Sequence, residues 1–198
     1  MRQNGLEAAI LKEAAKGKVI FGVCGGYQML GQTLSDPHHV EAGGQIEGMG
    51  LLPMDTVFEE AKTRTRVCGQ LCELTGVLKE MSGVPLEGYE IHMGESVPRE
   101  ETACMSRITD QVTGAKKVDG LCAGNVYGTY IHGIFDREEV TKGLMEAIGK
   151  AKGVDVSEMT GVDFAAFKET QYDLLADGLR KHLDMEKIYE ILNAGVEE

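Results

Sequence analysis

The sequence lacks any long apolar segment and has few basic residues. Its apolar runs, such as VIFGV, are far shorter than the roughly 20 residues that a membrane-spanning helix needs. The first residues, MRQNGLEAAILKEAAKGK, do not have the composition of a secretory signal peptide. The net charge of −12 disfavours partners with a phosphate backbone and anionic membrane surfaces. We therefore expect a cytoplasmic protein that binds neither nucleic acid nor membrane.

Repeats, low-complexity tracts and phosphate-binding strings are also missing. No G-x-x-x-x-G-K-[ST] string occurs in the 198 residues, and such a string holds phosphates in many ATP-binding proteins. We therefore expect no cofactor in this chain. The length and the 42% hydrophobic content are those of one ordinary globular domain.

Cysteines are few, at positions 24, 68, 72, 104 and 122. An odd number without a secretory leader predicts reduced thiols rather than a disulfide framework. Cys68 and Cys72 have C-x-x-x-C spacing, but no second pair or histidine cluster completes four zinc ligands, so no metal site is expected. Cys104 and Cys122 have small or apolar neighbours, which is typical of thiols in a core.

The order of apolar and turn-forming residues predicts an α/β fold. The expected helices span residues 5–16, 26–34, 137–150 and, with one or two breaks, 164–192. The expected strands span 19–23, 51–59, 63–74, 84–94, 102–110 and 121–136, and a surface loop is expected over 35–50. These elements predict a mixed sheet with helices on its faces and a site at the carboxyl ends of strands.

A cysteine at a glycine-rich corner is the candidate nucleophile. Gly22, Cys24 and Gly26 form the G-x-C-x-G pattern of a nucleophile elbow, in which a strand turns sharply into a helix. Both glycines are expected because a Cβ would collide with the neighbouring turn. The helix dipole is expected to lower the pKa of Cys24 from about 8.5 toward neutrality. A structural cysteine in a glycine-rich turn is the alternative, but the strand and helix on either side favour the nucleophile.

A thiolate nucleophile usually works with an imidazole. His132 is the best placed, because it follows the strand-like run 126–131 and precedes Gly133. The sequence also offers His38 and His39 in the expected loop, His92 in a strand, and His182 in a charged helix.

These motifs resemble the class I glutamine amidotransferases. Gly22, Cys24, Gly26 and Gln28 match the family pattern G-x-C-x-G-x-Q, and Gly128 with His132 matches the later G-x-x-x-H. The strings GYEIHMG, YGTYIHGIFD and YDLLADGLRKHLDMEKIYEIL are similar to the C-terminal glutaminase domain of the cobyric acid synthase family. This resemblance covers nearly the whole chain. It implies a flavodoxin-like class I glutamine amidotransferase fold with a mixed, mainly parallel sheet.

The resemblance also implies roles for individual residues. Cys24 would attack the side-chain amide of glutamine, and His132 would transfer the protons. The N–H of Gly25 would be one oxyanion donor, a type of contact that contributes about 3 to 4 kcal/mol to lowering a barrier. The residues expected to bind or line the site are Gly25, Gly26, Tyr27, Gln28, Tyr89, Glu90 and His92. The string GYEIHMG has a structural interpretation as well, as an edge strand that meets a turn at Gly94.

The partners follow from the same resemblance. Cobyric acid synthases pass ammonia to an ATP-dependent synthetase domain, which uses Mg²⁺ and amidates corrinoid carboxylates. That reaction converts adenosylcobyrinic acid a,c-diamide to adenosylcobyric acid in cobalamin biosynthesis. The synthetase domain is expected to be absent from residues 1–198, so it would be a partner domain or subunit. The alternatives are the glutaminase subunit of lipid II isoglutaminyl synthase, which serves peptidoglycan amidation, and a non-catalytic docking fragment.

The sequence departs from the family in two places. Many relatives have a Glu two residues after the histidine, but Ile134 occupies that place here, so a Cys–His dyad is implied. Glu90 and Asp136 are the carboxylates that could still act on the imidazole. Relatives also have, before the helix near Gly5, a strand and loop that supply a second oxyanion N–H. We therefore expect an N-terminally truncated glutaminase domain with weak or no activity alone.

Overall fold

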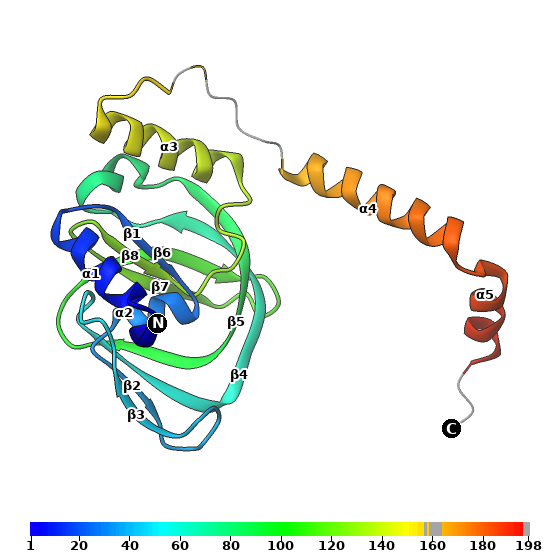
Figure 1. Ribbon diagram of the computed structural model, residues 1–198, viewed down its shortest axis with the longest axis horizontal. Helices are drawn as coiled ribbons and strands as arrows, with labels where there is room; N and C mark the ends of the chain where they lie inside the picture. The colour runs from blue at the N-terminus through cyan, green and yellow to red at the C-terminus, as the bar shows by residue number, and fades with distance from the viewer. Residues whose placement is uncertain (157, 159–163, 196–198) are drawn as a thin grey trace. The chain divides into compact units, whose positions relative to one another are not determined.

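The computed structural model describes residues 1–156, 158 and 164–195, which fall into two compact units (Figure 1). The unit Met1–Gly161 contains η1 (Arg2–Asn4), α1 (Leu6–Ala15), β1 (Ile20–Val23), α2 (Gly25–Leu30), β2 (Thr33–Asp36), β3 (Gly44–Glu47), β4 (Met54–Leu71), η2 (Gly76–Met81), β5 (Pro85–Pro98), β6 (Ala103–Asp110), β7 (Lys116–Ala123), β8 (Val126–Thr129) and α3 (Glu138–Lys152). The unit Val162–Glu198 contains α4 (Phe164–His182) and α5 (Met185–Ala194). Within these described residues no helix is long and apolar enough to cross a membrane.

In the described part of the first unit, eight strands form one mixed sheet. Its order is β1-β8-β7-β6-β4-β2-β3, and β5 pairs with β4 outside this path. The pairs β1–β8 and β2–β4 are parallel, whereas the five other pairings are antiparallel. The predicted mixed sheet is confirmed, but the expectation of a mainly parallel one is wrong. Short connections such as that between β6 and β7 can join only antiparallel neighbours, because a parallel pair needs a crossover.

Helices cover both faces of this sheet. Successive strand residues point to opposite faces, as Val126 and Tyr127 of β8 do by belonging to different core clusters. One cluster lies beneath α2 and is formed by Tyr27, Leu30, Leu52, Met54, Leu121 and Tyr130. The other includes Leu78 of η2 and Val140 of α3, which pack together beside the sheet (Figure 1). The carboxyl ends of β1 and β8 therefore lie between two well-packed layers.

Two segments differ from the sequence expectation near the first helix. The predicted helix 26–34 ends at Leu30, because Gly31 is extended and packs so closely on Met54 that a Cβ would lie 2.8 Å from the Met54 carbonyl oxygen. Residues 33–36 then pair in parallel with β4. The predicted loop 35–50 contains β3, which pairs with β2. Helix propensity was overridden here by strand pairing.

The central strands are longer than predicted. The pieces 51–59 and 63–74 belong to one strand, β4, which pairs with β5 on either side of an irregularity between Phe58 and Thr63. β7 begins at Lys116 rather than at residue 121. The helices predicted over 5–16 and 137–150 are confirmed to within two residues as α1 and α3. The last predicted helix is confirmed with its break, as α4 and α5.

The prediction of five reduced thiols is wrong for two of them. Cys72 and Cys104 form a disulfide, with their Cα atoms 6.0 Å apart. β6 pairs with the end of β4, which places Cys104 beside Cys72 at a spacing that a disulfide can bridge. Cys104 is therefore not a free core thiol. Cys122 is a buried free thiol as predicted, and Cys24 and Cys68 are free and partly buried.

Candidate active site

The corner between β1 and α2 holds Cys24 in an unusual backbone conformation. β1 ends at Val23 and α2 begins at Gly25, so the strand turns into the helix at one residue. The φ of 52° and ψ of −115° at Cys24 are rarely adopted by a residue that has a Cβ. Such conformations persist where the surrounding fold imposes them. The predicted strand, sharp corner and helix are confirmed, and together they have the form of a nucleophile elbow.

Close packing requires only the first of the two flanking glycines. A Cβ on Gly22 would lie 2.7 Å from Leu30 Cδ1 and 2.8 Å from the backbone of Gly26. A Cβ on Gly25 or Gly26 would meet nothing within 4 Å. The prediction of a collision is therefore correct for Gly22 and wrong for Gly26, because a Cβ at Gly26 would extend into open space.

This difference gives a matched pair of substitutions. Gly22→Ala should lower the free energy of unfolding by about 1 to 3 kcal/mol, because the new methyl group overlaps the first turn of α2. Gly26→Ala should leave it unchanged or raise it by up to about 1 kcal/mol, because alanine favours helix. Denaturant unfolding measures both values. Equal losses in the two variants would contradict the packing described at this corner.

The surroundings of the Cys24 sulfur favour the protonated thiol. Sγ lies 3.8 Å from the carbonyl oxygen of Ile91. Burial raises the pKa of Cys24, and the backbone N–H of Gly25 offsets that effect only in part. The prediction that the pKa of Cys24 is lowered toward neutrality is therefore wrong. The helix α2 has only six residues, and its dipole does not outweigh the loss of solvent around the sulfur.

His132 lies just beyond the carboxyl end of β8, next to the end of β1. The two strands are parallel, with Val23 opposite Thr129, and the N–H of Cys24 donates to the carbonyl oxygen of Thr129 at 2.9 Å. The backbone of His132 forms an isolated bridge with Tyr89, and the two rings stack 5.1 Å apart at 9°. Nε2 of His132 is buried and has no hydrogen-bond partner in the described structure.

Cys24 and His132 lie along the same edge of β5. Tyr89 exchanges both of its backbone hydrogen bonds with His132, so that edge faces away from β4. Ile91 is two residues further along and presents its carbonyl to the same edge, where it contacts the Cys24 sulfur. Positions two residues apart on a strand are about 7 Å apart. β5 therefore aligns the sulfur of the predicted nucleophile and the backbone of the predicted base along one edge, at positions two residues apart.

Tyr27 and Gln28 are buried behind the corner. Tyr27 packs against Gly128, where a Cβ would lie 2.1 Å from its ring, and it contacts the Tyr130 ring edge to face. Nε2 of Gln28 donates to the hydroxyl of Tyr130 at 3.4 Å. A Cβ on Gly94 would lie 2.3 Å from that same nitrogen. Both side chains fix α2 against β5 and β8.

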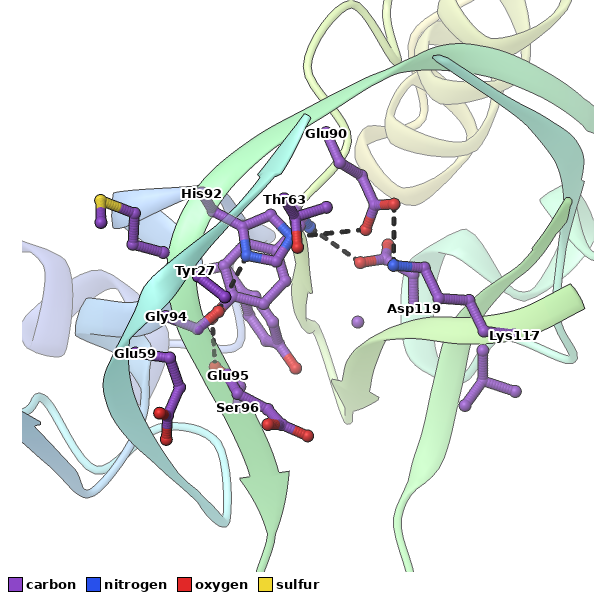
Figure 2. A pocket seen from close by; sticks show the side chains of 15 residues that line it. Tyr27, Glu59, Thr63, Glu90, His92, Gly94, Glu95, Ser96, Lys117 and Asp119 are labelled. Atoms are coloured by element: carbon purple, nitrogen blue, oxygen red, sulfur yellow. Dashed lines mark hydrogen bonds and ion pairs between the residues drawn. The ribbon is translucent and has the colours of Figure 1, made fainter. Parts of the chain in front are cut away.

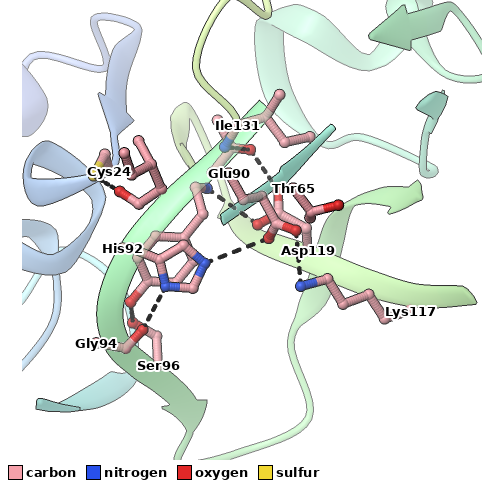
Figure 3. A network of polar contacts seen from close by, with 12 residues as sticks. Cys24, Thr65, Glu90, His92, Gly94, Ser96, Lys117, Asp119 and Ile131 are labelled. Carbon is pink, nitrogen blue, oxygen red and sulfur yellow. Dashed lines mark hydrogen bonds and ion pairs between the residues drawn. The ribbon is translucent and has the colours of Figure 1, made fainter. Parts of the chain in front are cut away.

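Glu90 and His92 lie across β5 from Cys24 (Figure 3). The carboxylate of Glu90 lies 3.5 Å from Nε2 of His92 and 2.8 Å from Nζ of Lys117. Burial raises the pKa of Glu90, but the contacts with His92 and Lys117 outweigh burial and hold the pKa below its ordinary value. Nδ1 of His92 lies 2.8 Å from the carbonyl oxygen of Gly94, so this nitrogen carries a proton. Glu90 is therefore a buried charged group held by His92 and Lys117.

This charged group lines a cavity of about 380 Å³ (Figure 2). Tyr27 of α2 and Tyr130 both line the cavity, and the Tyr130 ring stacks on His92 with centroids 3.8 Å apart. Acidic side chains outnumber basic ones in its walls, and they include Glu59, Glu95 and Asp119. Cys24 and His132 are not among the residues that line it.

Asp119 is a buried carboxylate that sequence reasoning missed. It accepts hydrogen bonds from the hydroxyl of Thr129, from the N–H of Tyr130 at 3.0 Å and from the hydroxyl of Ser106 at 3.3 Å. Burial raises its pKa, in spite of these donors, and the charge of Glu90 adds to the increase. Its position inside a strand would have been a signal, but the strand was expected to begin at residue 121. Asp119 fixes the backbone that leads from β8 to His132.

The remaining candidates lie outside this group or are structural. Ile134 is buried in the core, and the carboxylate of Asp136 lies beside Gly133. His38 is exposed, 4.0 Å from Glu59, and His182 contacts the carbonyl oxygen of Gly178 within α4. Among the described residues, no group of three or more His, Cys, Asp or Glu side chains is arranged to hold a metal ion.

Comparison with known proteins places this arrangement in a family. A thiol at a strand-to-helix corner, with an imidazole on the same strand edge, is typical of enzymes that use cysteine for acyl transfer. Residues 1–140 match the model of the CobB/CobQ-like glutamine amidotransferase domain. The chain belongs to that family.

Curated relatives extend the match over the whole chain. The cobyric acid synthase of Ruminiclostridium cellulolyticum is 48% identical over 199 residues, which cover 100% of this chain and 39% of that protein. The cobyric acid synthase of Lachnoclostridium phytofermentans is 46% identical over 99% of this chain and 40% of its own length. The chain thus spans about two fifths of the length of these relatives. A glutamine amidotransferase structure from Thermotoga maritima aligns with 15% identity and a TM-score of 0.40 over 77% of this chain and 57% of that one.

Proposed function

We propose that this chain hydrolyses glutamine and supplies the ammonia to an ATP-dependent synthetase that amidates a corrinoid. The observation that carries the proposal is the placement of Cys24 and His132 along one edge of β5. The extent of the match to cobyric acid synthases supports the acceptor. The parallel pairing of β1 with β8 supports a flavodoxin-like class I glutamine amidotransferase fold around the site.

The reaction uses the chain's own groups. The sulfur of Cys24 attacks the amide carbon of glutamine while His132 accepts the thiol proton. His132 then gives that proton to the leaving nitrogen, which departs as ammonia. Water, deprotonated by His132, hydrolyses the thioester and releases glutamate and the free thiol. The backbone N–H of Gly25, which already faces the sulfur, would stabilise the oxyanion.

The start of α2, which follows Cys24 in the chain, is not crowded. A Cβ on Gly25 or Gly26 would meet no atom within 4 Å other than those of its chain neighbours and its own helix. We assign these two glycines, with Tyr27 and Gln28 behind them, to the glutamine site. Tyr89 lies at the same edge of β5 as Cys24. Glu90 and His92 stay predictions as site residues, because they face the cavity across that strand.

The synthetase partner would bind ATP and Mg²⁺, and the corrinoid would meet this chain through that partner. The test is to combine the chain with the synthetase, ATP, Mg²⁺, a corrinoid a,c-diamide and glutamine labelled with ¹⁵N at its amide. Label should appear in new corrinoid amides, detected by mass spectrometry, and it should be absent with Cys24→Ala. Label that appears only in a lipid II acceptor would instead support the peptidoglycan alternative. Normal amidation with Cys24→Ala would indicate a docking role.

A further inference from the structure

The position two residues after His132 holds no carboxylate to orient the imidazole in a three-membered arrangement. A third member fixes the tautomer and the direction of the ring and stabilises its charged form. The residue two positions after His132 is Ile134, which is 1% exposed, belongs to the core and has no polar side-chain atom. Glu90, the nearest buried carboxylate on β5, is engaged by His92 and Lys117. Neither Ile134 nor Glu90 therefore supplies a carboxylate for orienting His132.

Tyr89 contacts His132 through both its backbone and its side chain. The N–H of His132 donates to the carbonyl oxygen of Tyr89 at 2.8 Å, and the N–H of Tyr89 donates back at 3.1 Å. The two rings are almost parallel, at 9°, with centroids 5.1 Å apart. The backbone bridge fixes the position of the histidine Cα, and the stacked ring restricts rotation of the imidazole.

The neighbouring residue allows this close approach. A Cβ on Gly88 would lie 2.2 Å from the carbonyl oxygen of His132 and 2.5 Å from Ile131 Cγ2. Any larger residue would push β5 away from the segment that carries His132. Tyr89 itself is 48% exposed, so the core does not depend on burying its ring. The side chain of Tyr89 contributes little to the core, and its ring lies against the imidazole of His132.

We infer that Tyr89 is a positioning residue, which holds the imidazole of His132 toward Cys24 by ring stacking. It would take the role that a carboxylate has as the third member of a triad. This inference rests on the proposed use of His132 as the base for Cys24. The aromatic face also stabilises an imidazolium, because a ring attracts a cation placed over it. The tyrosine hydroxyl is not needed for either effect. Phenylalanine should therefore replace Tyr89, whereas alanine and leucine should not.

The test measures thiol reactivity, which requires neither the synthetase nor turnover. Cys24 is alkylated with iodoacetamide between pH 6 and pH 9 in wild type, Tyr89→Ala, Tyr89→Leu, Tyr89→Phe and His132→Ala. Tyr172→Ala, at an exposed tyrosine of α4, is the matched control. At pH 7 the rate should fall about ten-fold in Tyr89→Ala and Tyr89→Leu, since misplacing a reacting group by about 1 Å costs up to a hundred-fold. The pH profile of both should approach that of His132→Ala, and Tyr89→Phe should retain the wild-type profile.

Labelling by a glutamine analogue separates positioning from substrate binding. If Tyr89 positions His132, the maximal labelling rate falls in Tyr89→Ala while half-saturation stays at the wild-type concentration. A raised half-saturation with unchanged iodoacetamide reactivity would overturn the inference and make Tyr89 a glutamine contact. Unchanged reactivity in Tyr89→Ala, with a slow His132→Ala, would overturn it as well. Unchanged reactivity in His132→Ala would overturn both the inference and the proposed dyad, whereas failure of the analogue alone would count against glutamine as substrate.

Discussion

Replacing Cys24 by alanine should abolish covalent labelling by a glutamine analogue that has an electrophilic γ-carbon. The analogue can form a stable thioether only with a sulfur that lies beside the amide-binding space. Loss of an enzyme's nucleophile typically lowers rates by at least about a thousand-fold. Intact-mass spectrometry measures the result directly, as one added mass in wild type and none in the variant.

The chain offers a matched control for this experiment. Cys68, in β4, is free and partly buried like Cys24, but it does not lie at a strand-to-helix corner. Cys68→Ala should be labelled at the wild-type rate. Labelling of Cys24→Ala, or loss of labelling in Cys68→Ala, would show that another thiol reacts.

The pH dependence of labelling has a defined sign. Burial raises the pKa of Cys24, so the thiolate fraction at pH 7 is smaller than that of a free cysteine. Labelling should therefore become faster as the pH is raised from 7 toward 9. A rate that is already maximal at pH 7 would mean that His132 maintains the thiolate as an ion pair, and His132→Ala should then restore the steep increase.

Removing the buried carboxylate of Asp119 should have the largest effect on stability. Asp119→Ala leaves the N–H of Tyr130 and the hydroxyl of Thr129 buried without their acceptor. Each unsatisfied buried group costs about 1 to 3 kcal/mol, so we expect a loss of about 2 to 4 kcal/mol in the free energy of unfolding. Denaturant unfolding measures it. Asp177→Ala, at an exposed site in α4, should change stability by less than about 0.5 kcal/mol.

Asp119→Asn tests the charge separately from the hydrogen bonds. Asparagine keeps a carbonyl oxygen for the Tyr130 N–H, so its loss should be smaller than that of alanine. Burial raises the pKa of Asp119, and the folded state therefore retains a proton at pH values where the unfolded chain has released it. Stability from this group is present at low pH and is lost as the pH rises from about 4 through the folded-state pKa. Wild type should thus lose stability relative to Asp119→Asn over that range, and a constant difference would contradict the assignment.

The local structure around Cys24 could be predicted from the sequence better than the arrangement of the sheet around it. The pattern around Cys24 defines a strand, a corner and a helix because glycine and apolar residues act over a few positions. Four of the five antiparallel pairings, β2–β3, β4–β5, β6–β7 and β7–β8, join consecutive strands, so the expectation of a mainly parallel sheet came from the resemblance and not from a missing local signal. Pairing between strands that are not consecutive is not local, which explains Thr33 and Leu34: they were expected to continue the helix, but they pair in parallel with β4.

The features that could not be predicted from the sequence depend on the folded surroundings of the residues concerned. The pKa of Cys24 depends on how much solvent the folded chain removes, and no spacing rule contains that quantity. Asp119 fell outside the strand expected over 121–136, although its carboxylate accepts a hydrogen bond from the N–H of Tyr130, two residues before His132. Cys72 and Cys104 are 32 positions apart, and only the pairing of β4 with β6 brings them together.

The edge of β5 that joins Cys24 and His132 has a consequence for folding. The sulfur and the Ile91 carbonyl that it contacts are separated by 67 positions, and β1 and β8 lie at opposite ends of the first unit's sequence. Contacts of such long range form late, because closing the intervening loops costs entropy before any pairing compensates for it. The native pKa of Cys24 should accordingly return only when the whole sheet has assembled. The pH dependence of Cys24 alkylation is thus a natural reporter of completed refolding.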